Sequence, residues 1–340
     1  MHYFGGLFLD YRIPSFLGGL MLQPQYIDRC TQLDRLCWEG VIDALIAGHR
    51  LPRAAITDTV LAQGPNRLLN RSARIDGLGY VVKSVTVFPN NPDREQFLPS
   101  VQGICTVFDE CTGQVHALID SELLTYWKTA ADSVLGARLL GPAEPEHLVI
   151  IGAGQVARSL IDAYTALFPS IEIVTLCVRR IKSAKWLKQF VAADKKLHPF
   201  TVQVSTDKAA VVPRGDIVVT ATTSETPVLK GSWLKTGVHV DLVGAYTIDT
   251  READDTTLQR GNLYVDSRDT TVDHIGELVI PLASGAIGPD SVLGDLYDLL
   301  NRAAEVQKEP RNSEQITVFK NGGGAHLDLM VANYLMSLDP

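Results

Sequence analysis

The sequence contains no long apolar run and no excess of positive charge. Nowhere in its 340 residues do about 18–20 apolar residues follow one another, as a membrane-spanning helix requires. Asp10, Arg12 and Pro14 interrupt the apolar N-terminal region, which also lacks a basic start, so a signal peptide is not expected. The formal net charge of −8 disfavours binding to nucleic acid through phosphate neutralisation. We therefore expect neither a membrane nor a nucleic acid as a partner.

Cysteine is also scarce. Five cysteines are present, at positions 30, 37, 105, 111 and 177. None forms a CxxC pair, and none lies at a spacing from histidine that is typical of zinc sites. The sequence has no HExxH, Ser/His/Asp or paired-carboxylate pattern either. It thus predicts free thiols in a reducing cytoplasm and no metal centre.

Length and composition indicate a globular protein of two domains, at roughly 100–200 residues each. In the first 120 residues, apolar residues recur at helical spacing over 30–47. Four short β-type runs follow at 79–82, 84–88, 103–108 and 115–119, and the last two form a hairpin around Thr112 and Gly113. This part predicts an α+β domain with an antiparallel sheet.

From residue 121 the pattern changes to alternating strands and helices. Asp120 and Ser121 begin a helix that ends at Gly141 and Pro142. Strands are expected at 147–151, 171–178, 201–204, 216–222, 239–243 and 263–266, with helices at 155–167 and 183–197. Val/Ile/Leu-rich strands separated by helices predict an α/β domain with a doubly wound parallel sheet. The segment 316–336 has a strand-like start, a glycine loop and an amphipathic helix. It has no clear place in that sheet and is expected to fold back onto the first domain.

A glycine-rich turn marks the start of the parallel sheet. Gly152 and Gly154, with Ala157 at the third position, form a GxGxxA motif between a strand and a helix. The first glycine allows the tight turn, the second lets a pyrophosphate approach the backbone, and the alanine lets the helix pack closely. We expect a dinucleotide cofactor here, with Gln155 and Val156 at the helix N-terminus. A tight turn of another doubly wound fold is the alternative.

Two arginines indicate which nucleotide is preferred. NAD-selective sites carry an acidic residue at the end of the second strand, about 20 residues after the glycine motif. Glu172 lies at the opposite end of that strand, whereas Arg179 and Arg180 follow its carboxyl end and suit a 2′-phosphate. NADPH is therefore the expected cofactor and NADH the second choice. Two solvated surface arginines are the alternative.

Further cofactor contacts are expected where later strands end, because ligands bind outside the carboxyl ends of parallel strands. Small residues that permit close approach follow two of these strands: Thr220, Ala221 and Thr222, then Gly244 and Ala245. Gly323, in the NGGG loop at 321–324, is expected to bring the backbone close to the cofactor.

Three cations outside the nucleotide sheet are candidates for binding a carboxylate. Lys83 lies within an otherwise apolar strand and needs an anionic partner or an exit to solvent. Arg53 and Lys128 are the other two. Each has a structural alternative, with Arg53 as a surface residue and Lys128 in an i,i+4 pair with Asp132. The scattered histidines at 116, 274 and 326 are interpreted as structural.

Several longer stretches are more specific than any single motif. They are VKSVTVFPNN (82–91), ALIDSELLTYWKTAADSVLGARLL (117–140), IIGAGQVARSL (150–160), DIVVTATTSETPVLKGSWLKTGVHVDLVGAY (216–246), YVDSRDTTVDHIGELVIPLASGAI (264–287) and TVFKNGGGAHLDL (317–329). Across them the sequence resembles the ornithine cyclodeaminase/mu-crystallin family. The resemblance implies a substrate-binding and dimerisation domain made of residues 1–124 and 313–340, with a Rossmann domain (125–312) inserted. It also implies a homodimer built through the first domain.

The resemblance assigns roles to the three cations. The family's strand lysine matches Lys83, and the arginine of the linking helix is replaced by Lys128, which keeps the charge but loses the bidentate fork. Arg53 matches an arginine that helps to bind the substrate carboxylate. The three residues are expected to bind that carboxylate, with Lys83 or a bound water as the catalytic proton source.

Tyr246 departs from the pattern of the cyclodeaminases, which carry an aspartate base at this position. A tyrosine, with a pKa of about 10, is a poor base at neutral pH, so we place Tyr246 among the substrate-binding residues. This residue and the YWKTAADS stretch resemble the ketimine reductase branch. Its members reduce Δ1-pyrroline-2-carboxylate and Δ1-piperideine-2-carboxylate to proline and pipecolate, by hydride transfer to C2. Proline, hydroxyproline and lysine metabolism all use this chemistry.

Two other functions remain open from the sequence. One is a different reaction on the same scaffold, as in ornithine cyclodeaminase or an alanine-type amino-acid dehydrogenase. The other is a non-catalytic NADP-binding protein of the crystallin kind. Ammonia release would identify the first, and cofactor binding without turnover the second.

Overall fold

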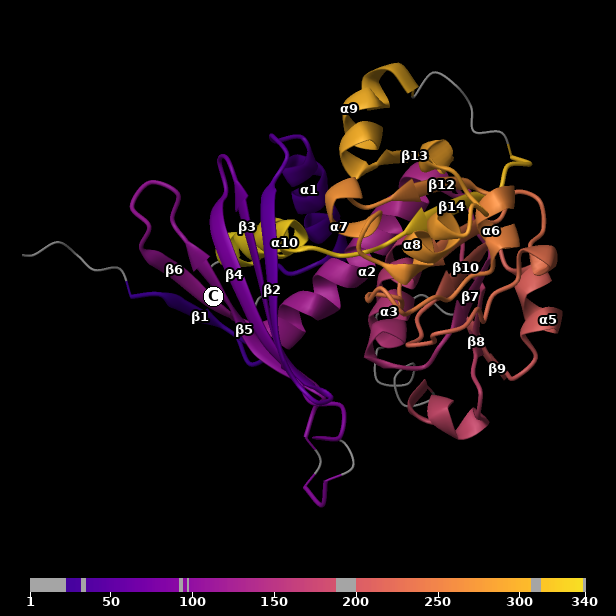
Figure 1. Cartoon of the computed structure of the whole chain (residues 1–340), viewed down its shortest axis with the longest axis horizontal. Helices are drawn as coiled ribbons and strands as arrows, with labels where there is room; N and C mark the ends of the chain where they lie inside the picture. The colour runs from indigo at the N-terminus through magenta and orange to yellow at the C-terminus, as the bar shows by residue number, and fades with distance from the viewer. Residues whose placement is uncertain are drawn as a thin grey trace, which may run out of the picture.

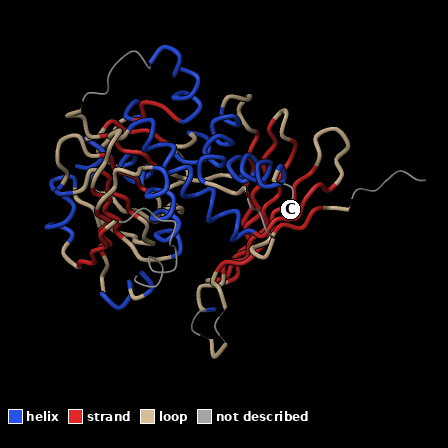
Figure 2. Tube along the Cα trace, turned by 180° about the vertical axis from the view of Figure 1, so that it is seen from behind, coloured by secondary structure: helices blue, strands red, loops and turns tan. Residues whose placement is uncertain are grey.

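Two β-sheets with helices between them form the structure (Figure 1). The computed structural model describes residues 23–31, 35–91, 94–96, 98–187, 200–306 and 313–338. One sheet comes from residues 25–120 and the other from residues 147–320. The long helix α2 (Ser121–Leu140) connects the sheets and packs against strands of both. Seen from behind, helices again lie between the strands of the two sheets (Figure 2).

The first sheet has six strands in the described part of the chain, in the order β1-β6-β5-β4-β3-β2. They are β1 (Gln25–Ile27), β2 (Ala55–Gln63), β3 (Asn66–Ile75), β4 (Gly79–Val87), β5 (Val101–Phe108) and β6 (Val115–Asp120). β1 and β6 pair in parallel, and the other described pairs are antiparallel, as predicted. In the predicted β5–β6 hairpin, Gly113 adopts a φ of 68°, which favours glycine.

Two features of this sheet differ from the sequence prediction. The runs at 79–82 and 84–88 form the single strand β4, because Lys83 continues the alternation and faces inward with Val81 and Val85. β2 and β3 carry no clear strand signal in the sequence. Nearly every residue of β2 is exposed, so its sequence lacks the alternation of a half-buried strand. Both strands form by pairing outward from β4.

Three helices pack together on the inner side of this sheet. α2 and α10 (Ala325–Ser337) contact its strands, and α1 (Trp38–His49) packs against both helices. α2 begins where predicted, because the Asp120 side chain accepts hydrogen bonds from the amides of Glu122 and Leu123. α1 begins at Trp38, later than the predicted residue 30. Residues 32–34 of that prediction lie outside the described residues.

The second sheet has eight strands within the described ranges, in the order β13-β12-β14-β11-β10-β7-β8-β9, and all its pairs are parallel. They are β7 (His147–Ile151), β8 (Ile173–Cys177), β9 (Thr201–Ser205), β10 (Ile217–Thr220), β11 (His239–Leu242), β12 (Asn262–Val265), β13 (Val292–Asp295) and β14 (Thr317–Lys320). The doubly wound parallel sheet is therefore confirmed, and each of the six expected strands is present. β13 and β14 are additional.

Short helices connect these strands. They are α3 (Gln155–Leu167), η2 (Ile181–Ala184), α5 (Lys208–Val211), η3 (Val212–Arg214), η4 (Gly231–Trp233), α6 (Asp255–Arg260), α7 (Arg268–Thr271), α8 (Gly276–Ala283), η5 (Pro289–Ser291) and α9 (Leu296–Val306). α3 has the predicted bounds. The predicted helix at 183–197 lies mostly outside the described residues, and η2 covers its first residues.

The C-terminal segment differs from the expectation that it has no place in the parallel sheet. β14 is an interior strand, paired with β11 on one side and β12 on the other, although the expected division assigned residues 313–340 to the first domain. All four residues of β14 are buried, which a central parallel strand requires. Of this segment, α10 packs on β3 and β4 of the first sheet. The loop at 321–324 therefore lies where the two parts of the molecule meet (Figure 1).

Candidate active site

The glycine-rich turn lies between β7 and α3, as predicted. Gly152 has a φ of 137°, and a Cβ atom built on it would lie 2.3 Å from the carbonyl oxygen of Ala221. The fold itself therefore requires glycine at this position. Gly154 has an ordinary φ of −83°, and a Cβ atom there would meet nothing within 4 Å. The space beside Gly154 at the N-terminus of α3 suits a phosphate group, which needs close approach to the backbone. Ala157 is fully buried, so α3 packs closely.

A buried carboxylate holds together the loops that follow β10 and β11. Glu252 accepts hydrogen bonds from the hydroxyl of Thr220 (2.8 Å) and from the amide (2.6 Å) and hydroxyl (2.7 Å) of Thr222. Oε2 of Glu252 also accepts hydrogen bonds from the amides of Gly244 (2.6 Å) and Ala245 (3.2 Å). These are four of the residues predicted to line the cofactor, and Ala221 lies between two of them. Glu252 fixes the shape of this surface, and no local pattern in the sequence indicates this role.

The two arginines of the nucleotide prediction are exposed. Arg179 and Arg180 follow the carboxyl end of β8, which ends at Cys177, while Glu172 precedes the strand. In a parallel sheet the carboxyl ends share one edge, so both arginines lie on the same edge as the glycine-rich turn. A 2′-phosphate site at these two arginines stays a prediction.

Lys83 and Lys128 come together around one carboxylate. Nζ of Lys83 donates to Oγ1 of Thr125 (2.6 Å) and to Oδ1 of Asp328 (3.1 Å). Nζ of Lys128 lies 2.9 Å from Oδ2 of Asp328 and donates to the carbonyl oxygen of Gly324 (3.1 Å). The three charged side chains are nearly or fully buried. The alternative pairing of Lys128 with Asp132 is wrong, because Lys128 turns toward α10 instead.

Burial and charge act in opposite directions on these groups. Burial lowers the pKa of Lys128 to about 8, although the carboxylate of Asp328 opposes the shift. Burial alone would raise the pKa of Asp328, but the ammonium groups of Lys128 and Lys83 outweigh it and hold that pKa below its usual value. Asp328 is therefore ionised at neutral pH.

A row of charged side chains crosses the first sheet. Asp58 on β2 pairs with Arg71 on β3, and Arg71 pairs in turn with Lys83 on β4. Directly paired residues share one face of the sheet, so the three side chains are neighbours. Nε of Arg71 donates to Oδ2 of Asp58 over 2.8 Å. Arg71 is absent from the sequence prediction because its strand was not recognised.

Arg53 lies apart from the two lysines. Its guanidinium donates both Nη groups to the carboxylate of Asp295, over 2.8 and 3.1 Å, and stacks 4.5 Å above the ring of Tyr297. Arg53 also lies 3.7 Å from Asp269, which lines the adjacent cavity. The structure thus brings two of the three predicted cations together and ties the third to the protein's own carboxylates.

A cavity of about 590 Å³ separates the row of charges from the second sheet. Its walls are β2 and β3 on one side, and on the other the loops after β11, β12 and β14. It is lined by Ala54, Ile56, Asp58, Val60, Arg67, Leu69, Arg71, Val87, Tyr246, Thr247, Asp269, Thr270, His274, Ile275 and Gly322. Tyr246 therefore lines the cavity, as predicted for a substrate-binding residue, and its side chain is largely exposed. The volume suits a small-molecule ligand.

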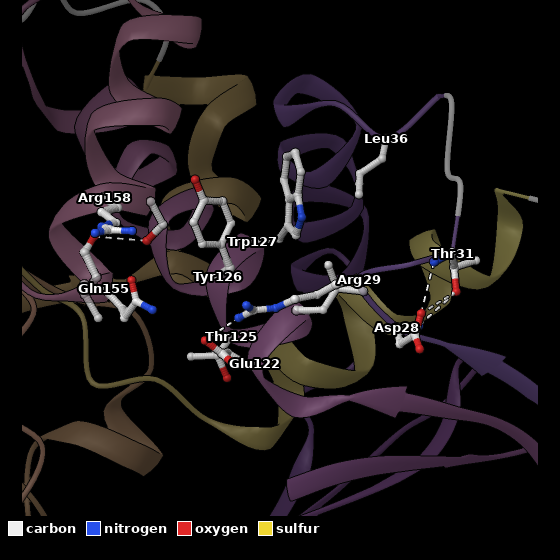
Figure 3. Close-up of a pocket in the computed structure, with 13 residues that line it drawn as sticks. Asp28, Arg29, Thr31, Leu36, Glu122, Thr125, Tyr126, Trp127, Gln155 and Arg158 are labelled. Atoms are coloured by element: carbon white, nitrogen blue, oxygen red, sulfur yellow. Dashed lines mark hydrogen bonds and ion pairs between the residues drawn. The ribbon is translucent and has the colours of Figure 1, made fainter. Parts of the chain in front are cut away.

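A second cavity of about 590 Å³ lies between α2 and the first turns of α3 (Figure 3). Gln155 and Val156 line it, together with Thr125, which also bonds Lys83. Arg29 and Glu122 form an ion pair in its wall. The helix N-terminus predicted to bind the cofactor is thus accessible from this side.

The NGGG loop is anchored by a second buried carboxylate. Oδ2 of Asp266 accepts hydrogen bonds from the amides of Gly322 (3.0 Å) and Gly323 (2.6 Å). Gly323 has a φ of 69°, which favours glycine. Asp266 follows β12 and the loop follows β14, so both lie at the carboxyl edge of the sheet. Gly323 is therefore close to the predicted cofactor surface.

Metal binding and membrane spanning find no support in the part of the chain that the structure describes. Those residues include no group of three or more His, Cys, Asp or Glu side chains able to hold a metal ion. No helix among them combines the length and apolar character needed to cross a membrane. The five cysteines are free thiols.

The fold defines the class of protein: a Rossmann-type parallel sheet combined with an α+β domain that carries a buried cationic cluster. The chain belongs to the ornithine cyclodeaminase/mu-crystallin family, whose model matches residues 71–337. Both the predicted family and the predicted fold class are thereby confirmed.

Relatives within the family are named as reductases. The Δ1-pyrroline-2-carboxylate reductase of Paracoccus denitrificans is 48% identical over 315 residues, which are 92% of this chain and 96% of the relative. Ketimine reductase mu-crystallin of Mus musculus is 32% identical over 235 residues, which are 69% of each chain. The solved structure of Thermococcus litoralis Δ1-pyrroline-2-carboxylate reductase in complex with NADH and L-proline superimposes with a TM-score of 0.81. It is 26% identical, and the match covers 92% of this chain and 97% of that one.

Proposed function

We propose that this protein is an NAD(P)H-dependent reductase of small cyclic imines that carry a carboxylate. Its substrates are Δ1-pyrroline-2-carboxylate and Δ1-piperideine-2-carboxylate, and its products are L-proline and L-pipecolate. The observation that carries the proposal is the buried Lys83–Asp328–Lys128 cluster beside a cavity at the carboxyl edge of the parallel sheet. The names of the relatives, and the NADH and L-proline bound in the Thermococcus structure, support the same reaction.

The charge of the site matches a substrate with one carboxylate. Three cations, Arg71, Lys83 and Lys128, face two carboxylates, Asp58 and Asp328. One positive charge is left over. Charge attraction is strong around the buried Lys83, Lys128 and Asp328, whereas Arg71 and Asp58 are partly exposed. A monoanionic ligand in the adjoining cavity would balance it.

The residues of the chain position the substrate and provide a proton. A nicotinamide cofactor at the glycine-rich turn supplies the hydride. As C2 of the C=N bond gains that hydride, the ring nitrogen must gain a proton, so that the product carries a CH–NH bond. Lys83 is the proposed catalytic proton source, since Thr125 and Asp328 fix its ammonium group. Lys128 binds the carboxylate and Tyr246 contacts the ring from the cavity wall.

Cofactor selection, assembly and location complete the proposal. Arg179 and Arg180 favour NADPH, with NADH as the second cofactor. The protein forms a homodimer through the first domain, where the edge strand β2 exposes Val60 and Leu61. Free thiols support a cytoplasmic location.

The test is oxidation of reduced nicotinamide by the purified protein, followed by absorbance. Each of the two ketimines is offered with NADPH and with NADH, and ammonia release from ornithine with NAD⁺ is measured in parallel. Turnover of either ketimine is the expected result. Ammonia release alone would identify a cyclodeaminase, which needs a base other than Tyr246. Tight cofactor binding with no turnover would identify a binding protein.

A further inference from the structure

The guanidinium of Arg53 is already occupied. Both of its Nη groups bond the carboxylate of Asp295, and its flat face covers Tyr297. A bidentate pair of this kind uses the fork that would otherwise bind a substrate carboxylate. Asp295 is itself fixed, because its amide donates to Asp298 and its carboxylate accepts from the amide of Asp298. Arg53 therefore ties the start of β2 to the end of β13.

Arg71 presents a guanidinium with a free fork. Asp58 accepts from Nε, and within the described ranges neither Nη group makes a hydrogen bond. The side chain is 21% exposed and lines the cavity beside Tyr246 and Gly322. A Cβ atom built on Gly323 would lie 3.9 Å from Nη1, so the guanidinium reaches the loop that follows β14.

The neighbours of Arg71 favour an anion at this point. Arg71 and Lys83 are directly paired across β3 and β4, and like charges in such a pair repel one another. Lys128 lies on the other side of Asp328, and the charge of Arg71 acts on both. Asp328 and Asp58 compensate two of the three cations. A ligand carboxylate between Arg71 and the lysines would compensate the third.

We propose that Arg71 binds the substrate carboxylate through its two Nη groups, in the role that the family resemblance gives to Arg53. The inference rests on the proposed function, since it names a substrate contact of that same site. Asp58 holds the guanidinium in plane through Nε, and Lys128 adds a point charge. The fork that is lost where lysine replaces arginine at position 128 is supplied from β3 instead.

The experiment compares Arg71→Gln with Arg74→Gln. Arg74 is exposed, lies three residues later on β3 and is not among the residues that line either cavity, so it is a control for loss of one positive charge on the same strand. Steady-state kinetics with Δ1-pyrroline-2-carboxylate and saturating NADPH give KM and kcat, and inhibition by L-proline gives its inhibition constant. We expect KM and the inhibition constant of L-proline to rise roughly 10- to 100-fold in Arg71→Gln. Arg74→Gln should change them by less than about threefold.

Three outcomes would overturn the role of Arg71: unchanged constants in Arg71→Gln, equal increases in both variants, or an increase confined to Arg74→Gln. Each is compatible with turnover by the wild type. Absence of wild-type turnover with either ketimine would instead overturn the proposed function. If Arg71→Gln does not fold, Arg71→Lys replaces it, because lysine keeps the charge and loses the fork. A several-fold rise in KM then supports the role, and an unchanged KM overturns it.

Discussion

Nζ of Lys83 lies 3.1 Å from Oδ1 of Asp328, although 245 positions separate the two residues along the chain. The contact joins β4 of the first sheet to α10, the helix that leaves the second sheet. Asp328 is fully buried and also pairs with Lys128 on α2. One carboxylate thus sets the positions of two ammonium groups from different elements. The cationic site exists only when all three elements are packed.

Replacing Lys83 with Met should abolish the reductase activity while the protein remains folded. The change removes the proposed proton source and one cation, but Asp328 keeps Lys128 as its partner. We expect kcat/KM for Δ1-pyrroline-2-carboxylate to fall at least about 100-fold and the free energy of unfolding to fall by about 2–4 kcal/mol. Kinetics and urea unfolding measure these effects, with the exposed Lys230→Met as the control. Wild-type kinetics in Lys83→Met would contradict the assignment.

Substrate affinity should weaken as the pH rises through about 8. Burial lowers the pKa of Lys128 to about 8, so its ammonium group, and its attraction for the carboxylate, are lost above that pH. Asp328 on α10, Lys83 on β4 and Arg71 on β3 are the charged neighbours. Lys128→Arg keeps its charge because an arginine does not titrate in this range. KM measured between pH 6 and about 10 should rise in the wild type and stay level in this variant.

The lowered pKa of Lys128 also affects the stability of the fold, which should increase as the pH rises while substrate affinity falls. The folded pKa of Lys128 lies below the unfolded value of about 10.4. Between these two values the unfolded chain binds more protons, so stability from this group increases with pH. The stability of wild type relative to Lys128→Arg should therefore grow from about pH 8 upward. A decline over that window would show that Lys128 is not desolvated.

Alanine substitutions at the two motif glycines should separate folding from cofactor binding. Gly152→Ala places a Cβ atom 2.3 Å from the Ala221 carbonyl oxygen and at an unfavourable φ. It should lower the free energy of unfolding by about 2–4 kcal/mol. Gly154→Ala meets no protein atom within 4 Å. We expect nearly wild-type stability and a Kd for NADPH raised roughly 10- to 100-fold. Thermal unfolding and fluorescence titration measure both, and unchanged binding in Gly154→Ala would count against a cofactor at this turn.

Glu252→Gln should loosen the surface formed by the loops after β10 and β11. Oε1 of Glu252 accepts from the amide of Thr222 and Oε2 from the amide of Gly244. Glutamine replaces one of these oxygens with an NH₂ group, so in either orientation a buried donor faces a donor. We expect a loss of about 2–4 kcal/mol in stability. The Kd for NADPH should rise, whereas the inhibition constant of L-proline at saturating cofactor should change little. Equal effects on both ligands would indicate general unfolding rather than a local positioning role.

Removing the two arginines after β8 should change cofactor choice. Arg179→Ala combined with Arg180→Ala removes two exposed positive charges beyond the strand. Because each charge-assisted contact to a phosphate is partly solvated, kcat/KM with NADPH should fall roughly 10-fold. The value with NADH, which has no 2′-phosphate, should stay within about twofold. Equal losses with the two cofactors would show that the arginines do not select a 2′-phosphate.

Local signals explain which parts of the molecule are predictable from the sequence. β7 and α3 have the predicted bounds, because a continuous apolar run, two glycines and an amphipathic helix follow one another without interruption. The start of α2 is equally local, since the Asp120 side chain caps it. Lys83 is a detectable candidate because a charge within an apolar strand needs a partner.

Other features depend on partners that are distant in the sequence. β14 is a strand-like run in the sequence, but its four residues do not reveal that it pairs between β11 and β12. Its Lys320 ammonium group is fully buried and donates to the carbonyl oxygens of Leu242 and Asn321. The register of β3 against β4 places Arg71 beside Lys83, and no short segment of the sequence encodes that register. Asp328 is the one carboxylate of α10, a helix of mostly apolar residues, and the argument applied to Lys83 also indicates that Asp328 needs a partner.

The position of β14 links the assembly of the molecule to the order of its synthesis. β14 fills the space between β11 and β12, and α10 then packs against β3, β4 and α1. During synthesis, neither the parallel sheet nor the group of helices on the first sheet is therefore complete until residues 317–337 have left the ribosome. Until then β11 and β12 lack the strand that lies between them, and β3 and β4 lack the helix that packs on them, although α1 and α2 are already present. The nascent protein is most prone to aggregate before residues 317–337 are available, and it acquires its cationic site in the same step that removes this risk.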